Sequence, residues 1–284
     1  ILVLKNNKGT DDNRVRKLDY SIQLSKLFYE RFIKNEEITL FSPHDVPGLY
    51  DSFGTERFDD LYLKYENDES IPKSSVGAQE LILDLLKERA ETGRIYIMNI
   101  DHCNSHSSFK DKVSMSNLCQ EITLPTEPIQ HIDDHLGEIS LCILSAVNVG
   151  TIRNDDELED LCDLSVRGLE ELIDYQQYPV FAAEQATKAR RSLGVGFIGL
   201  AHYLAKLGFK YESQEAWDAV HGLSESFQYY LLKSSNKIAQ EKGWCENFGR
   251  TKYADGILPI DTYKKDVDDI SKQGLQHDLS LIHI

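Results

Sequence analysis

The sequence predicts a fold of the α/β class, and three observations lead to this prediction. Stretches with helical periodicity alternate along the chain with short apolar stretches that are typical of strands. The longest apolar stretch, EISLCILSAVNV at 138–149, is nearly continuous, as in a strand buried on both faces. Hydrophobic residues make up 41% of the chain and charged residues 27%, which is the composition of a folded globular protein.

The first part of the chain contains two predicted strands and two predicted helices. Residues 1–5 suit a short buried strand, because turn-prone asparagine and glycine residues follow them. The segment 15–34 is predicted to be one helix, since its apolar residues form a single stripe: Leu18, Ile22, Leu27, Phe28 and Phe32. Prolines make 42–50 a loop. A second helix should cover 77–91 and end near a glycine, and a strand should follow at 94–100.

The second part of the chain is predicted to be mainly helical. After the strand at 138–149, Asn154 is placed to cap a helix whose apolar side chains lie on one face. The spacing of apolar residues predicts further helices at 197–206 and 214–242, and Gly243 should end the last of them. Helices therefore follow strands in both parts of the chain, as the α/β class requires.

Composition and charge exclude several classes of protein. The net charge of -16 argues against general nucleic-acid binding, which needs clustered lysine and arginine. No apolar run approaches the ~20 residues of a membrane span, and no secretory signal is present. The five cysteines are an odd number with irregular spacing, which argues against a secreted disulfide framework. We therefore expect a cytoplasmic protein with no membrane or nucleic-acid partner.

The two ends of the chain lead us to expect an excerpt from a longer protein. The sequence begins at Ile1, without an initiator methionine, and enters an apolar run at once. It finishes with LSLIHI, an apolar tail without a capping or polar ending.

Two kinds of motif point to a cofactor or a metal but lack the required context. Residues 194–199 read G-x-G-x-x-G, yet a dinucleotide motif needs a strand before its first glycine, and the preceding sequence is charged and helix-like. Two histidine pairs could chelate a metal only if they lay on helices, and both occur in turn-rich sequence: His102 with His106, and His131 with His135. We expect no metal site and no directly bound cofactor.

The stretch SNLCQEI at 116–122 is the strongest candidate for chemistry. In an extended segment alternate side chains share a face, which would bring together the amide of Asn117, the thiol of Cys119 and the carboxylate of Glu121. A conventional cysteine nucleophile needs a base close in space, usually histidine. A histidine that is distant in the sequence could supply this base, so a cysteine acyltransferase or protease stays an alternative. Glu121 is a poor base for a thiol but, if it is buried and its pKa is raised, a reasonable one for a hydroxyl, which indicates another use of the thiol.

The other cysteines have apolar or undistinguished surroundings. Cys162 lies on the apolar face of a predicted helix and is expected in the core. Cys103 follows a strand and is expected to be structural, and Cys245 receives no role. Cys142 stands in the centre of an apolar strand and, taken by itself, would also be a core residue.

Five segments together resemble a known family. They are TGRIYIMNIDHCNSH, SNLCQEITLPT, GEISLCILSAVNVG, ITLFSPHDVPGLYDSF and GILPIDTYKKD. These segments resemble the large (α) subunit of class I ribonucleotide reductase in its aerobic bacterial and T-even-phage form. The resemblance covers residues 1–278, which would be an incomplete part of the catalytic barrel domain. Residues 279–284 lack the family pattern, and we expect them to be a junction or an artefact.

The resemblance implies a fold and a role for each candidate residue. The chain would be part of a ten-stranded α/β barrel, made of two antiparallel halves of parallel strands, with 116–122 as a central finger loop. Cys119 would become a thiyl radical and abstract the ribose 3′-hydrogen of a ribonucleoside diphosphate. Glu121 would take the 3′-hydroxyl proton, and Asn117 would hydrogen-bond the ribose hydroxyls. Cys142 would be one of two thiols that end as a disulfide, with its partner outside this chain.

The resemblance also implies partners. The parent protein would depend on a radical from a metal-containing small (β) subunit, on ATP and deoxynucleotide effectors, and on thioredoxin or glutaredoxin. Its large subunits would form a homodimer, and the present segment alone would be inactive. Two alternatives remain open: a cobalamin-dependent ribonucleotide reductase with the same barrel, and a non-catalytic barrel relative.

Overall fold

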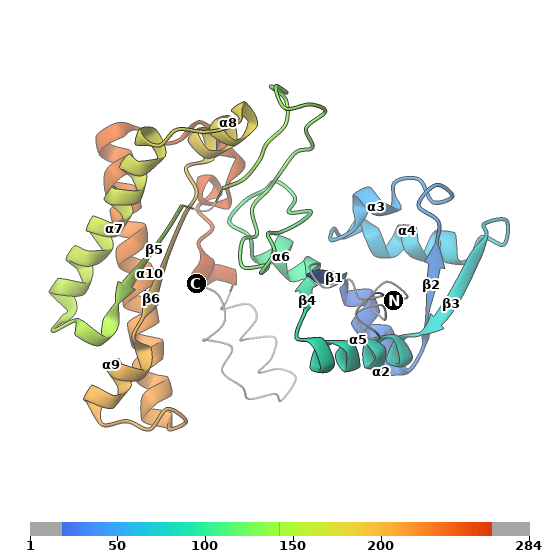
Figure 1. The fold of residues 1–284 in the computed structure, drawn as a ribbon, viewed down its shortest axis with the longest axis horizontal. Coiled ribbons are helices and arrows are strands. Elements are labelled where there is room, and N and C mark those ends of the chain that lie inside the picture. The colour runs from blue at the N-terminus through green and yellow to red at the C-terminus, as the bar shows by residue number, and fades with distance from the viewer. Residues whose placement is uncertain (1–18, 142, 263–284) are drawn as a thin grey trace, which may run out of the picture. The chain divides into compact units, whose positions relative to one another are not determined.

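The computed structural model describes residues 19–141 and 143–262, and the chain divides into two compact units. Unit 1 covers Ile1–Pro125 and unit 2 covers Thr126–Ile284. The predicted strand at 1–5, the tail at 279–284 and Cys142 lie outside the described residues. Within them the fold is mixed α/β, as predicted (Figure 1).

Unit 1 contains four strands and five helices among its described residues. The strands are β1 (Tyr20–Leu24), β2 (Glu37–Phe41), β3 (Lys73–Gly77) and β4 (Ile95–Asn99). The helices are α2 (Lys26–Lys34), α3 (Leu49–Ser52), α4 (Arg57–Glu66), α5 (Ala78–Thr92) and α6 (Ile100–His106). β1 pairs with β4 in parallel, and β2 pairs with β3 in antiparallel orientation.

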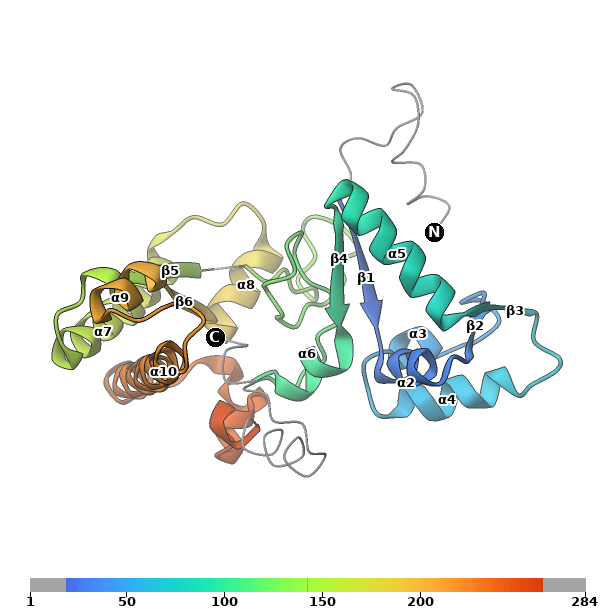
Figure 2. The ribbon, with the colours of Figure 1, turned by 90° about the horizontal axis from the view of Figure 1, so that it is seen from below.

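The parallel pair β1–β4 buries one face against helices α2 and α5, and Figure 2 shows α5 beside the pair. Leu24 and Ile95 from the strands pack with Phe28, Ile82 and Leu85 from the helices. Alternation along a strand sends neighbouring side chains to opposite faces, so the second face of this pair is free to carry other groups.

The prediction of one helix over 15–34 is wrong in part. Residues 20–24 form β1, because Tyr20, Ile22 and Leu24 also repeat with the period of two that suits a strand. Helix α2 begins only after Ser25, whose hydroxyl accepts a hydrogen bond from the backbone N–H of Phe28 at 3.3 Å. The helix at 77–91 and the strand at 94–100 are confirmed as α5 and β4. The antiparallel pair β2–β3 was not predicted.

Unit 2 has two described strands and four α-helices. The strands β5 (Ile143–Asn148) and β6 (Leu193–Ile198) are parallel neighbours. The helices are α7 (Asp155–Tyr175), α8 (Phe181–Arg190), α9 (Leu200–Leu207) and α10 (Gln214–Lys242), and the 3₁₀ turns are η2 (Val149–Thr151), η3 (Glu246–Arg250) and η4 (Lys252–Asp255). Figure 1 and Figure 2 both show α7 and α10 beside the β5–β6 pair.

The helix ends of unit 2 follow the predicted capping chemistry. The side chain of Asn154 accepts a hydrogen bond from the N–H of Glu157 at 2.9 Å, which starts α7 as predicted. Helix α10 has the predicted bounds and ends at Gly243. The predicted helix at 197–206 begins later, at Leu200, because the glycine-rich residues before it form β6.

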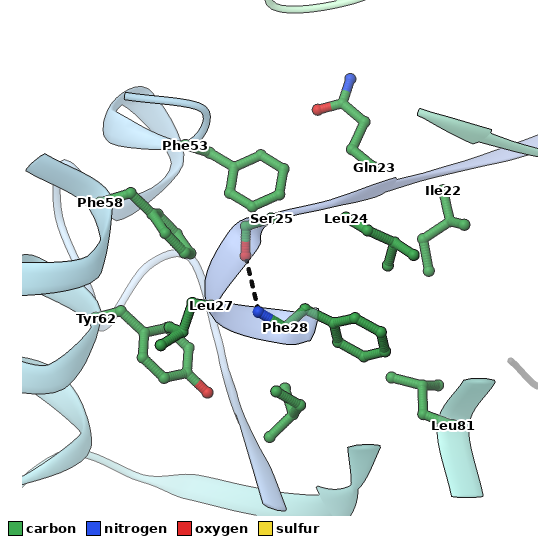
Figure 3. Close-up of a pocket in the computed structure, with 11 residues that line it drawn as sticks. Ile22, Gln23, Leu24, Ser25, Leu27, Phe28, Phe53, Phe58, Tyr62 and Leu81 are labelled. Carbon is green, nitrogen blue, oxygen red and sulfur yellow. Dashed lines mark hydrogen bonds between the residues drawn. The ribbon is translucent and has the colours of Figure 1, made fainter. Parts of the chain in front are cut away.

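An apolar pocket of about 180 Å³ lies in unit 1 between β1, α2, α4 and α5 (Figure 3). Carbon atoms of Leu24, Leu27, Phe28, Phe58 and Tyr62 form much of its wall. Asn117, Cys119 and Glu121 do not line this pocket, so it is separate from the candidate site that the described residues form. No helix of the described residues is both long and apolar enough to cross a membrane.

Candidate active site

The segment that carries the candidate residues is anchored on the second face of the β1–β4 pair. Gln23 points away from Ile22 and Leu24, as Figure 3 shows, and therefore away from the helices. Its amide nitrogen donates a hydrogen bond to the carbonyl oxygen of Ser114 at 2.8 Å. Nearby, the fully buried Val113 packs in the same cluster as Met98 of β4. These contacts hold the segment before residue 116 against the strands.

Residues 116–122 form a turn rather than an extended segment, so the predicted alternation of side chains is wrong. The backbone N–H of Gln120 donates to the carbonyl of Asn117 at 3.1 Å, and Gln120 itself adopts a left-handed conformation with a φ of 63°. The base of the turn is closed by the side chain of Asn117, which accepts from the N–H of Ile122 at 3.2 Å. The hydroxyl of Ser116 also donates to the carbonyl of Ile122 at 2.5 Å.

The turn places the thiol of Cys119 at its tip. Cys119 is exposed, as are Asn117 and Glu121, so the described residues do not supply the enclosure that we expected for this sulfur. The three predicted residues are brought together by one loop rather than by one face of a strand. Cys142, the fourth predicted residue, lies outside the described residues.

A tyrosine that the sequence did not reveal lies beside this thiol. The hydroxyl of Tyr96, on β4, is 4.0 Å from the Sγ atom of Cys119 and is positioned to donate a hydrogen bond to it. This hydrogen bond and the negative charge of a Cys119 thiolate raise the pKa of the Tyr96 phenol, with smaller contributions from burial and from the carboxylates of Asp19 and Glu121. Tyr96 and Cys119 are 23 residues apart, so no local motif could have linked them.

The other described cysteines are poorly suited to chemistry. Cys162 is fully buried in the core of unit 2, as predicted, and burial raises the pKa of its thiol to about 11. Burial also raises the pKa of Cys103 and of Cys245. A thiol with a raised pKa carries little thiolate at neutral pH and is a weak nucleophile. Among these four cysteines, Cys119 alone is exposed.

The glycine motif at 194–199 does not form a dinucleotide site. Gly194 and Gly196 lie within β6, and the segment before them is the helix α8, so no strand precedes the first glycine. Packing explains Gly194, because a Cβ atom there would lie 2.5 Å from the Cδ2 atom of Leu144 on β5. Gly199 adopts a φ of 79° and precedes α9.

The first histidine pair lies on a helix, contrary to the prediction of turns. His102 and His106 belong to α6, with their ring centroids 5.6 Å apart. His135, from the second pair, packs edge-on against the ring of Phe181, with the two ring centroids 4.2 Å apart. In residues 19–141 and 143–262, no three histidine, cysteine or acidic side chains come together as a metal site.

The fold and the loop together define an α/β protein that displays a cysteine, an amide and a carboxylate on a turn above a parallel strand pair. Comparison with known proteins agrees with this description. Residues 1–280 match the family model described as the ribonucleotide reductase barrel domain. The chain therefore belongs to the ribonucleotide reductase barrel-domain family, and the resemblance seen in its sequence is confirmed.

Relatives from bacteria and from a phage share this sequence over nearly its whole length. The chain is 57% identical to the ribonucleoside-diphosphate reductase subunit alpha of Haemophilus influenzae, over 98% of its own length and 37% of the relative's. It is 54% identical to the ribonucleoside-diphosphate reductase 1 subunit alpha of Escherichia coli, with the same coverage. The subunit alpha of phage T4 is 43% identical, over 100% of the chain and 39% of the relative. The chain thus spans little more than a third of these relatives.

Proposed function

We propose that the chain is the central part of the catalytic barrel of a class I ribonucleotide reductase large subunit. The parent protein would reduce ribonucleoside diphosphates to 2′-deoxyribonucleoside diphosphates. The observation that carries this proposal is the turn at 116–122, which presents Cys119 at its tip with Asn117 and Glu121 on either side. The exposure of Cys119, in contrast to the buried thiol of Cys162, supports its role as the reacting sulfur.

In the proposed reaction a radical from the small subunit takes one electron and one proton from the Cys119 thiol. The resulting thiyl radical abstracts the 3′-hydrogen of the ribose, and Glu121 accepts the proton of the 3′-hydroxyl. The 2′-hydroxyl leaves as water, and two thiols supply two electrons and two protons as they form a disulfide. Cys142 would be one of these thiols, on the basis of the sequence alone. The 3′-hydrogen returns to the ribose, and the small subunit recovers its radical.

The side chain of Asn117 would have two tasks. Its oxygen closes the base of the turn by accepting from the N–H of Ile122, which fixes the backbone of the turn that carries Cys119. Its amide nitrogen would donate to the ribose hydroxyls and hold the sugar near the sulfur.

The expected ten-stranded barrel is consistent with the two parallel pairs, β1–β4 and β5–β6. Each pair buries one face against helices. The other face of β5–β6 exposes Leu144 and Ile198, each with more than half of its surface open. In the parent protein these second faces would line the barrel, and further strands would enclose Cys119.

The partners follow from the same proposal. A radical-generating small (β) subunit would oxidise the site, and thioredoxin or glutaredoxin would reduce the disulfide after each turnover. ATP and deoxynucleotide effectors would regulate a dimer of large subunits in the cytoplasm. Residues 1–278 would belong to the barrel domain.

The test is the variant Cys119→Ser in the full-length parent, assayed with its small subunit and a thiol reductant for deoxynucleotide formation. We expect loss of product, because a serine hydroxyl does not form the corresponding radical. Cys103→Ser is the matched control and should retain turnover. Full activity of Cys119→Ser would refute the proposal, turnover that requires adenosylcobalamin would favour the cobalamin-dependent class, and an inactive unaltered parent would favour a non-catalytic relative.

A further inference from the structure

We infer that Tyr96 is a positioning residue for Cys119, with its hydroxyl group donating a hydrogen bond that holds the sulfur above the β1–β4 pair. The inference rests on the proposed function, since it assigns a role within the same site. Its geometric basis is the separation of 4.0 Å between the Tyr96 hydroxyl oxygen and the Cys119 Sγ atom, at the long end of hydrogen bonds to sulfur.

The two partners differ in how firmly the fold holds them. Tyr96 lies inside β4, where its backbone is paired in register with Ser21 of β1. Its neighbours Ile95 and Met98 are each only 3% exposed, so the strand is anchored in the core on both sides of the tyrosine. The ring therefore projects from a fixed part of the sheet.

The thiol, by contrast, stands at the tip of a turn. Hydrogen bonds of Ser116 and Asn117 to Ile122 close the base of that turn, but they do not reach the sulfur. Within the part of the chain that the structure describes, the hydrogen bond to this sulfur comes from Tyr96. Removal of that contact would leave the turn closed but the thiol free to rotate about its side-chain bonds.

The groups around the Tyr96 phenol keep it protonated, which is the form that can donate a hydrogen bond. Cys119, Asp19 and Glu121 all disfavour ionisation of Tyr96, and the pKa of the phenol is raised accordingly. At neutral pH the hydroxyl therefore keeps its proton. A neutral donor orients the sulfur without adding a formal charge beside Glu121, whose proposed task is to accept a proton.

Tyr20 provides a matched control on the neighbouring strand. Its hydroxyl oxygen is buried and, among the described residues, has no hydrogen-bond partner. Tyr20→Phe and Tyr96→Phe each remove one oxygen atom from a tyrosine of the same strand pair. Only Tyr96→Phe removes a contact to the candidate sulfur.

The first measurement is turnover of both variants in the full-length parent with its small subunit. We expect Tyr96→Phe to lower kcat about threefold to tenfold, the range for one hydrogen bond, and to leave KM unchanged. Tyr20→Phe should leave both constants unchanged. Equal kinetics of the two variants, with Cys119→Ser inactive, would overturn the role of Tyr96 but not the proposed function.

A second measurement does not depend on turnover. A fluorinated tyrosine is placed at position 96 of the full-length parent, and its ionisation is followed by ¹⁹F NMR with and without Cys119→Ala. The variant should lower the pKa of the phenol, because it removes both the hydrogen bond and the nearby thiolate charge. An unchanged titration would show that the hydroxyl and the sulfur do not interact, and would overturn the inference even if Cys119→Ser is inactive.

Discussion

A buried ion pair in unit 2 gives the sharpest prediction about stability. The guanidinium of Arg190 donates from Nε and Nη2 to one carboxylate oxygen of Glu138, at 2.9 and 2.6 Å. The two side chains are only 3% and 11% exposed. Glu138 also forms a backbone bridge with Glu127, and helix α8 supplies Arg190. The pair therefore joins an irregular segment to a helix, without exposure to solvent that would screen it.

The expected cost follows from the burial of both charges. Glu138→Leu would remove the carboxylate that compensates the buried Arg190 guanidinium, and breaking a buried ion pair in this way typically destabilises a protein by about 3–5 kcal/mol. The ion pair between Arg250 and Glu138 contributes less to stability than the Arg190 pair, because the Nη1 atom of Arg250 is 3.5 Å from the Glu138 carboxylate and the Arg250 side chain is 45% exposed. An exposed pair of that kind is worth at most about 1 kcal/mol. The double variant Glu138→Leu with Arg190→Met removes both buried charges and should lose less stability than the two single variants added together.

The assay is urea unfolding followed by tryptophan fluorescence. Both tryptophans of the chain, Trp217 and Trp244, belong to unit 2, so the signal reports the unit that holds the pair. The slopes of unfolding should stay constant while the midpoints shift. Losses below about 1 kcal/mol in both single variants, or strictly additive losses in the double variant, would refute the reasoning.

Two further predictions concern titration and reactivity. The hydrogen-bonded guanidinium of Arg31 lowers the pKa of Glu66, and burial opposes this effect. The stability that this pair contributes to unit 1 should therefore be fully present above the ordinary glutamate pKa of about 4.3. It should be lost as the pH falls through the lower pKa of the folded state. Circular dichroism of urea unfolding against pH should show a shallower acid loss in Glu66→Gln, and parallel curves would contradict this. In the native chain, iodoacetamide should modify Cys119 before Cys162, as mass spectrometry of the peptides would reveal; equal rates would contradict the assigned burial.

The sequence predicted helix ends well where capping chemistry is local. Asn154 starts α7 and Gly243 ends α10 because the groups that satisfy the free backbone donors and acceptors belong to these residues themselves or to their immediate neighbours. The same reasoning placed the end of α5 at Gly93, which adopts a φ of 68°.

The sequence misled where two periodicities fit the same residues. Ile22 suits the stripe of a helix and also the alternation of a strand, and only pairing with β4 decides between them. The stretch at 193–198 contains two glycines, which weaken a strand and favoured the interpretation as a turn or helix start, yet it forms β6, and Gly194 allows the close approach of Leu144 on the neighbouring strand. Tertiary contacts supplied the deciding free energy in both cases.

The candidate site shows the same division between local and distant information. The sequence identified three candidate residues that lie close together in the chain: Asn117, Cys119 and Glu121. The predicted arrangement of their side chains on one face of an extended segment was wrong, because Gln120 adopts a left-handed conformation and the chain turns there. Tyr96 reaches the thiol only because β4 pairs with β1 and a separate segment crosses the second face of that pair. A residue that supports a reacting group from a neighbouring strand leaves no pattern in the sequence around that group. Its contribution can be identified only from coordinates, and it is measured by removing one hydroxyl group.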